Sequence, residues 1–135
     1  MKALAGEILS ENIAAEVEAF DCTVNASWEA DVIILAVPYM ADKEIADRIE
    51  EVASQKIVFS IANPLNETYT GLSTTLDSIA AEELQTLMPN SKVVKAFNTT
   101  FTANFTAPVI DGKQVDAFIA GNDSDALDTV SKISF

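Results

Sequence analysis

Four short apolar runs along the chain predict buried strands. The densest run is 32–37, where aliphatic and mostly β-branched residues follow one another until Pro38 closes the run. A continuous apolar run of this length, without polar alternation, is typical of a strand that is covered on both faces of a parallel sheet. Shorter runs of the same kind predict further strands at 56–61, 92–96 and 115–120.

Between these runs, apolar residues recur every three or four positions, which predicts helices. The segment 41–54 carries Ile45 and Ile49 on one face. It also places Glu44 and Arg48 four residues apart, where they can form an ion pair on the exposed side. A helix is therefore expected to follow the first strand.

The remaining helices are predicted from their start signals. Asp77 or Ser78 can cap a helix that runs to Met88, and the polar stretch 121–124 can cap a last helix. The segment 2–20 fits one or two helical turns on each side of a break, and its second half fits a helix or a strand equally well.

Strands that alternate with helices imply crossover connections and an α/β fold. We expect one domain over 1–135, with an open, mostly parallel sheet and helices on both faces. The four strands should neighbour one another in chain order, and the last can run in either sense. Ligands bind beyond the carboxyl ends of the strands in such sheets. The binding rim is therefore expected at 38–42, 63–66 and 97–100.

Composition narrows the range of functions. The chain has 135 residues, of which 8 are basic and 21 acidic, so its net charge is −13. It has no histidine and one cysteine, Cys22, which excludes Ser-His-Asp and Cys-His catalytic units, histidine metal sites and internal disulfides. A surface this negative repels nucleic acid and anionic lipid, and the run 32–37 is far shorter than the about 20 residues that span a bilayer. We expect no nucleic-acid or membrane partner and a cytoplasmic location.

The expected rim offers amides and hydroxyl groups for binding. Asn63 and Asn98 can donate and accept hydrogen bonds at once, which suits a carboxamide or a ribose. The alternative is that both side chains bond the backbones of their own loops. Thr99 and Thr100 either touch a ligand or simply end a strand. The rim is thus predicted to hold a ligand whose chemistry is supplied elsewhere.

Side chains close to the rim have structural as well as functional interpretations. Tyr39 and Met40 can wall an apolar slot or pack against a neighbouring helix. Asp42 stands at a helix start, where an acid complements the helix dipole. The acidic residues expected to be solvated helix charges are Asp77, Glu82 and Glu83.

Three ordered blocks of sequence resemble the deazaflavin-dependent NADP oxidoreductases, a family that is similar to pyrroline-carboxylate reductase. They read DVIILAVPY at 31–39, SIANPLN at 60–66 and VVKAFNTT at 93–100. Two further blocks match at 78–84 and 118–123. Each block is weak by itself, but five in the same order are more specific.

The resemblance implies a truncated Rossmann-like domain that binds NADP(H) and passes a hydride. On this basis Asn63 and Pro64 would border the nicotinamide, and Asn98 and Thr99 would line the side of the hydride acceptor or substrate. The residues that would lie along the ribose and phosphates are Ala36, Val37 and Pro38.

The sequence departs from that family at its beginning. Members open with a strand, a Gly-x-Gly-x-x-Gly turn, a helix and a second strand, and this chain is expected to start after all of them. Because the glycine turn brings backbone amides to the pyrophosphate, the chain alone should bind NADPH poorly. Two hypotheses stay open: an oxidoreductase fragment that needs a complementing N-terminal half, or a non-catalytic remnant that binds itself or a partner. In both, strand 32–37 lies at a sheet edge, so we expect a homo-oligomer or a complemented assembly. In the self-associated chain, either the segment 2–20 or the same strand of a second copy is expected to cover this edge.

Overall fold

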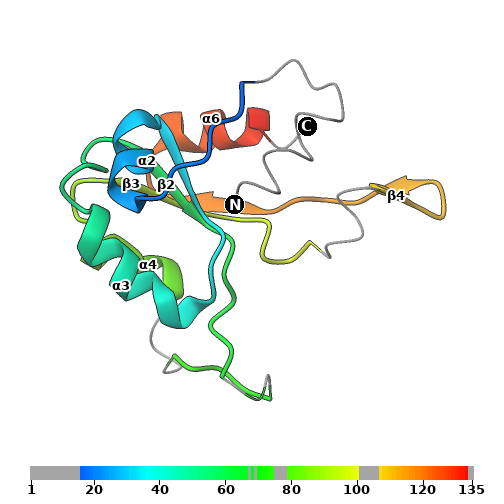
Figure 1. Ribbon diagram of the computed structural model, residues 1–135. Helices are drawn as coiled ribbons and strands as arrows, with labels where there is room; N and C mark the ends of the chain where they lie inside the picture. Colours follow the sequence, from blue (N-terminus) through cyan, green and yellow to red (C-terminus); the bar gives the residue numbers. More distant parts are fainter. Residues whose placement is uncertain (1–15, 67, 69, 75–78, 101–106, 134–135) are drawn as a thin grey trace.

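The computed structural model describes residues 16–66, 68, 70–74, 79–100 and 107–133 (Figure 1). The helices are α2 (Thr23–Glu29), α3 (Tyr39–Ile49), α4 (Ala80–Leu87) and α6 (Ser124–Ile133). The strands of the main sheet are β1 (Val32–Leu35), β2 (Ile57–Ser60), β3 (Lys92–Ala96) and β6 (Ile119–Gly121). A separate hairpin consists of β4 (Val109–Ile110) and β5 (Lys113–Gln114).

The four strands of the main sheet lie side by side in chain order, which confirms the predicted neighbours. β1, β2 and β3 are parallel, and β6 runs antiparallel to β3. Each parallel pair needs a crossover, which α3 supplies between β1 and β2 and α4 supplies between β2 and β3. The carboxyl ends of β1, β2 and β3 therefore meet at one edge of the sheet.

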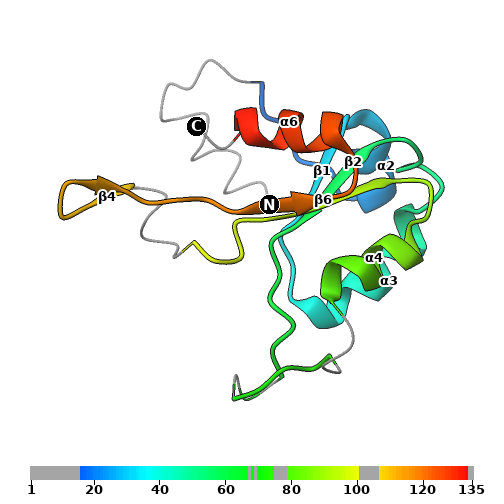
Figure 2. The ribbon, with the colours of Figure 1, turned by 180° about the vertical axis from the view of Figure 1, so that it is seen from behind.

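Helices cover both faces of the sheet, as the sequence predicted (Figures 1 and 2). α3 and α4 pack on one face, over the larger cluster of buried apolar side chains. α6 packs on the other face, where Phe59, Val94 and Val130 belong to a second cluster. The buried residues of the larger cluster are Ile33, Leu35, Ala46, Ile49, Ala53, Val58, Leu84, Met88 and Val93.

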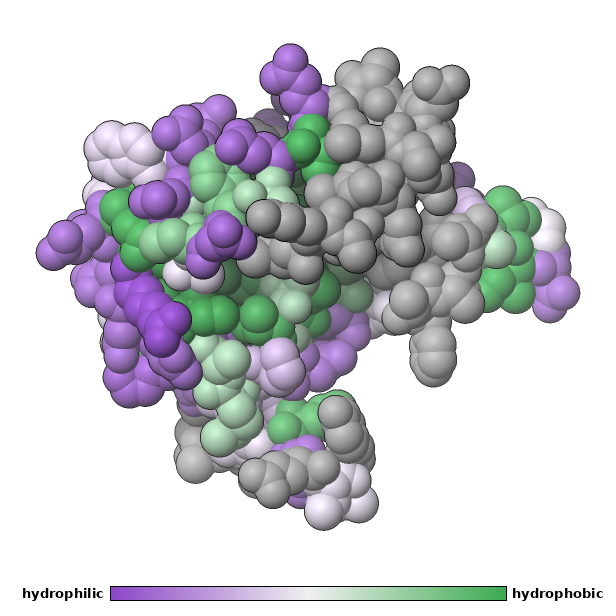
Figure 3. Space-filling model, in the orientation of Figure 1, coloured by the Kyte–Doolittle hydropathy of each residue, from purple (hydrophilic) through white to green (hydrophobic). Residues whose placement is uncertain are grey.

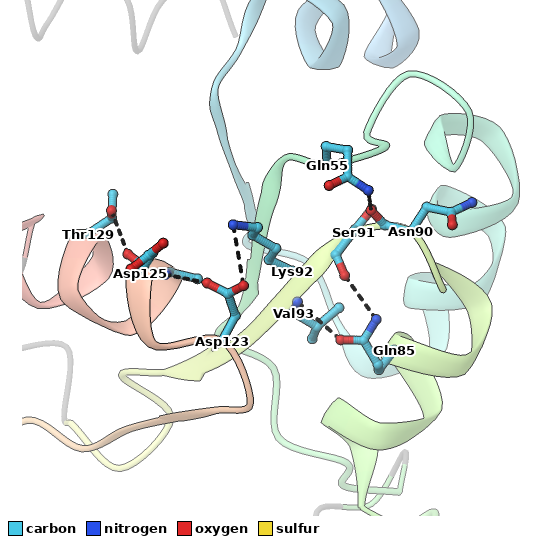
Figure 4. A network of polar contacts seen from close by, with 10 residues as sticks. Gln55, Gln85, Asn90, Ser91, Lys92, Val93, Asp123, Asp125 and Thr129 are labelled. Carbon is cyan, nitrogen blue, oxygen red and sulfur yellow. Dashed lines mark hydrogen bonds and ion pairs between the residues drawn. The ribbon is translucent and has the colours of Figure 1, made fainter.

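Polar contacts tie helices on both faces to β3 (Figure 4). The carboxamide of Gln85 in α4 donates to the carbonyl oxygen of Ser91 at 2.9 Å and accepts the backbone N–H of Val93 at 3.3 Å. Lys92 forms an ion pair with Asp123 at 3.3 Å, just before α6. β3 is thus fixed to the helix layers on both sides.

Three expectations about the helices can be compared with the structure. The Glu44–Arg48 ion pair forms, with 2.6 Å between its atoms. Asp123 Oδ1 accepts the N–H of Ala126 at 2.9 Å and caps α6, as predicted. The predicted bounds 41–54 of the first crossover helix were wrong, because α3 begins directly after Pro38 and ends at Ile49, and the chain then forms turns.

The start of α4 differs from the predicted cap. The helix begins at Ala80 with Ile79 in the N-cap position, and that position has no side-chain cap. Asp77 and Ser78 lie outside the described residues. Most of the segment 2–20 lies outside them as well, and its described part, 16–20, has no helix or strand.

The last sheet strand begins later than the predicted 115–120. Residues 115–118 form no strand, and the β4–β5 hairpin precedes them; its two turn residues, Asp111 and Gly112, have φ of 51° and 78°. Turns with positive φ at both central residues match the twist of paired strands, which explains the tight hairpin. The hairpin projects from the body of the protein (Figure 1), and its exposed Val109 and Ile110 give it the apolar patch at the right of Figure 3.

Candidate functional site

A cleft of about 610 Å³ opens at the carboxyl ends of β1 and β2. One wall is the short connection from β1 to α3, and the other is the segment that leaves β2. Among the residues singled out from the sequence, those that line the cleft are Ala36, Val37, Pro38, Tyr39, Met40 and Asn63. Folding therefore brings the first two parts of the expected rim together.

Asn63 and Asn98 are joined across the ends of β2 and β3. The side-chain amide of Asn63 donates to the backbone carbonyl of Asn98 at 3.1 Å, and the amide of Asn98 donates to Oδ1 of Asn63 at 3.2 Å. The two side chains thus bond to each other's segments rather than to their own loop backbones. Both are partly or fully exposed, so this pair presents a polar edge beside the cleft.

The turn after β3 sets the position of Asn98. Phe97 has φ of 58°, in the left-handed region that a bulky residue rarely adopts. Its ring packs edge-on against Phe59, with 5.9 Å between the ring centroids. Backbone held in such a conformation is typical of functional sites, where the surrounding packing maintains it.

The other expected site residues lie at the margin. Pro64 does not line the cleft, and its carbonyl accepts the N–H of Ser73 at 2.8 Å within the following loop. Thr99 is exposed beyond β3. The backbone N–H of Thr100 donates to the Phe97 carbonyl at 3.1 Å, which closes the turn. Thr100 thus helps to end the strand, one of the two roles considered for it.

Tyr39 lines the cleft and also contacts α4. Its hydroxyl donates a hydrogen bond to the Glu83 carboxylate. This bond raises the pKa of Tyr39 to about 12, because the phenolate would lose the bond and face the carboxylate charge. The prediction that Glu83 is a solvated charge was therefore wrong, because its carboxylate joins α4 to the first turn of α3. Glu82 is exposed, as expected.

Asp42 is buried rather than exposed at the start of α3. It is 5% exposed, and both carboxylate oxygens lack a hydrogen-bond partner among the described residues. Burial raises its pKa from 3.8 to about 6, and the nearby charge of Lys95 opposes the rise. A role limited to complementing the helix dipole does not account for this environment.

Lys95 is the polar residue that the sequence analysis missed. It lies in β3, and its ammonium group donates a hydrogen bond to the backbone carbonyl of Ala62, which lines the cleft. Burial lowers the pKa of Lys95, and the charge of Asp42 opposes this effect. The available signal was a lysine between the apolar Val94 and Ala96, in the interior of a strand that is covered on both faces.

A second pocket of about 300 Å³ lies between α4 and β6. Ile79, Val93 and Ala120 are among its apolar residues, and Lys95 and Glu82 bring charges to it. No group of three or more metal-ligating side chains occurs within the described part of the chain. Within the same residues, no helix is long and apolar enough to cross a membrane.

The fold and the position of the cleft define a Rossmann-like α/β domain. No family model matches the chain. The chain is homologous to the F420-dependent NADP reductase of Methanocaldococcus jannaschii, with 33% identity over 113 residues. That match covers 78% of this chain and 49% of the relative, so the chain spans about half the length of the relative.

Solved structures agree on the fold. A candidate F420-dependent NADP reductase from Arthrobacter sp. FB24 matches with a TM-score of 0.74 at 24% identity, over 83% of this chain and 53% of that protein. Plasmodium falciparum pyrroline carboxylate reductase, solved with NADP bound, matches with a TM-score of 0.55 at 17% identity. This second match covers 98% of this chain and 49% of the reductase.

Proposed function

We propose that this chain is part of an NADP(H)-dependent oxidoreductase and forms the nicotinamide side of its cofactor site. The observation that carries the proposal is the cleft at the ends of β1 and β2, which is lined by 36–38 and Asn63. These residues fall in the sequence blocks that resemble the deazaflavin-dependent NADP oxidoreductases. The name of the M. jannaschii relative makes a deazaflavin, F420, the proposed second cofactor of the hydride transfer.

The groups around the cleft fit the uncharged part of a dinucleotide. The backbone of 36–38 and the amides of Asn63 and Asn98 offer donors and acceptors for ribose hydroxyls and for a carboxamide. When NADP(H) is bound, its nicotinamide would accept the hydride in the oxidised form or donate it in the reduced form, and these groups would hold and orient the ring. None of the described glycines lines the cleft, so we assign the pyrophosphate contacts to another segment or to a complementing N-terminal half.

Calorimetric titration of the chain with NADPH tests the proposal. We expect binding in the millimolar range, because two or three missing charge-assisted phosphate contacts remove about 1.5–3 kcal/mol each, and about 1.4 kcal/mol is tenfold in affinity. Asn63→Ala and Asn98→Ala should weaken this binding, and Asn122→Ala, which lies at the second pocket, should not. Equal affinity in all three variants would remove the asparagine pair from the site.

The exposed edge of β1 favours a second candidate function, an association module. β1 pairs with β2 on one side, and on its other side no strand among the described residues pairs with it. Ile34 is 51% exposed although Ile33 and Leu35 beside it are buried. We propose that a second copy or a complementing N-terminal half covers this edge. A cytoplasmic location stays a prediction.

A further inference from the structure

The sheet face under α3 and α4 changes from apolar to polar toward the cleft. In β2, Val58 is followed two positions later by Ser60 on the same face, and in β3, Val93 is followed by Lys95. Ser60 is buried. Asp42 of α3 is buried too, and its charge interacts with that of Lys95. Buried polar groups therefore gather at the end of the core that adjoins the cleft.

Two of these groups, Ser60 and Lys95, bond Ala62, which lies two residues beyond the end of β2 and is buried. The N–H of Ala62 donates to Oγ of Ser60 at 3.3 Å, and its carbonyl accepts the hydrogen bond from Lys95. The next residue is Asn63, and both Ala62 and Asn63 line the cleft. A half-buried cation thus lies directly behind the cleft wall.

We propose that Lys95 is a positioning residue of the cleft. Its ammonium holds the Ala62 carbonyl and thereby sets where Asn63 presents its carboxamide. The consequence for nucleotide binding rests on the proposed function. The claim that Lys95 fixes the chain at Ala62 is independent of the proposed function.

The orientation of the Lys95 side chain supports this role. Lysine side chains normally extend so that the ammonium reaches water. Lys95 also lines the second pocket, which offers such a route, yet its ammonium bonds a carbonyl on the cleft side. Because a buried carbonyl without a donor is unfavourable, removing the ammonium should release the turn rather than leave it in place.

Lys95→Met removes the donor while keeping an unbranched side chain of similar length. Lys92→Met is the matched control, because it removes a lysine from the same strand whose ion pair, with Asp123, lies away from the cleft. The ¹H–¹⁵N signals of Ala62 and of the Asn63 backbone and side chain should move in Lys95→Met and stay near their original positions in Lys92→Met. Lys95→Arg, which keeps a charged donor, should largely restore them. Equal displacement in the two methionine variants would overturn the proposal.

A double variant separates positioning from general stability. Lys95→Met leaves the Asp42 carboxylate buried without its opposite charge, so the urea midpoint of unfolding should fall. Asp42→Asn combined with Lys95→Met removes that charge and should recover the midpoint, while the Ala62 and Asn63 signals stay displaced because the donor is still missing. Recovery of both the midpoint and the signals would mean that Lys95 acts on stability alone, which would overturn the proposal.

NADPH titrations followed on the backbone ¹H–¹⁵N signals of residues 36, 37, 39 and 40 report the consequence for the cleft. Affinity should fall about tenfold in Lys95→Met, the effect of one lost positioning interaction, and should be unchanged in Lys92→Met. Unchanged affinity in Lys95→Met would show that the turn does not control the cleft. A native chain that does not respond to millimolar NADPH would contradict the proposed function, and the displacement of the Ala62 and Asn63 signals would still decide the role of Lys95.

Discussion

Replacing Asp42 with Asn should stabilise the protein at neutral pH. The pKa of Asp42 is raised from 3.8 to about 6 in the folded protein, chiefly because burial disfavours the charged carboxylate. The folded state therefore binds the proton more tightly than the unfolded state does. Stability contributed by this group is greatest below pH 4 and is lost as the pH rises through 6. Asn has nearly the same shape as a protonated Asp and stays neutral at every pH.

The size of the effect follows from the two pKa values. Each pKa unit corresponds to about 1.4 kcal/mol, so ionising Asp42 in the fold costs up to about 3 kcal/mol at pH 7.5. The pKa of about 6 already includes the attraction of the Lys95 charge, so the loss of that attraction in the variant is counted in this figure. We expect Asp42→Asn to raise the free energy of unfolding by about 1–3 kcal/mol at pH 7.5 and to change it little at pH 4.

Urea denaturation of both proteins at pH 4, 5, 6 and 7.5 measures this difference. Other carboxylates titrate alike in the two proteins, so the difference between the two curves isolates Asp42. Glu44→Gln is a suitable control, because it neutralises a neighbouring acid that is exposed in an ion pair on the same helix. A variant that is less stable than the native protein at pH 7.5 would show that the ionised carboxylate is favourable in the fold, and would refute the reasoning from burial.

Two further substitutions test packing and the sheet edge. Gly121→Ala should destabilise the fold by about 1–3 kcal/mol, because the added Cβ would lie 3.1 Å from the Val93 carbonyl oxygen. Gly71→Ala is the control, since its added Cβ would lie 3.5 Å from the nearest atom, in the Asn66 side chain. Equal urea midpoints of unfolding for the two variants would contradict this prediction. Ile34→Lys should keep the fold, because the side chain is half exposed, and should abolish concentration-dependent self-association in sedimentation. The substitution changes the net charge from −13 to −12, so added repulsion could not explain such a loss. A native chain that is monomeric at every concentration would contradict self-association at this edge.

The sheet could be predicted from the sequence because its signals are local. A run such as 32–37 is too short and too apolar for a surface helix, and short crossovers make consecutive strands neighbours. The start of β6 could not be predicted in the same way. Residues 115–120 read as a strand by composition, but the N–H of Val115 still bonds across the hairpin to the Pro108 carbonyl, and 116–118 form no strand, so the sheet strand begins only at Ile119.

The cleft was predictable in part, because its walls follow directly from the ends of predicted strands. The environment of Asp42 was not, since an acid near a helix start is usually exposed. A signal was nevertheless present, because Asp42, Ala46 and Ile49 are spaced four and three residues apart and are the buried residues of α3. Helical periodicity places all three residues on the buried face of α3. Only the charge of the Asp42 side chain argued against its burial.

The buried charges can be traced to the way β2 ends. Backbone bonds to the neighbouring strand reach as far as the N–H of Ile61, and the chain then leaves the sheet while Ala62 is still buried. A buried carbonyl in that position needs a donor from outside the strand ladder, and Lys95 provides one. The charge of Asp42 attracts this half-buried ammonium, but burial of the carboxylate costs more than the attraction returns. The same irregular exit from β2 opens the cleft, so the groups that are least favourable for stability lie where a ligand would bind.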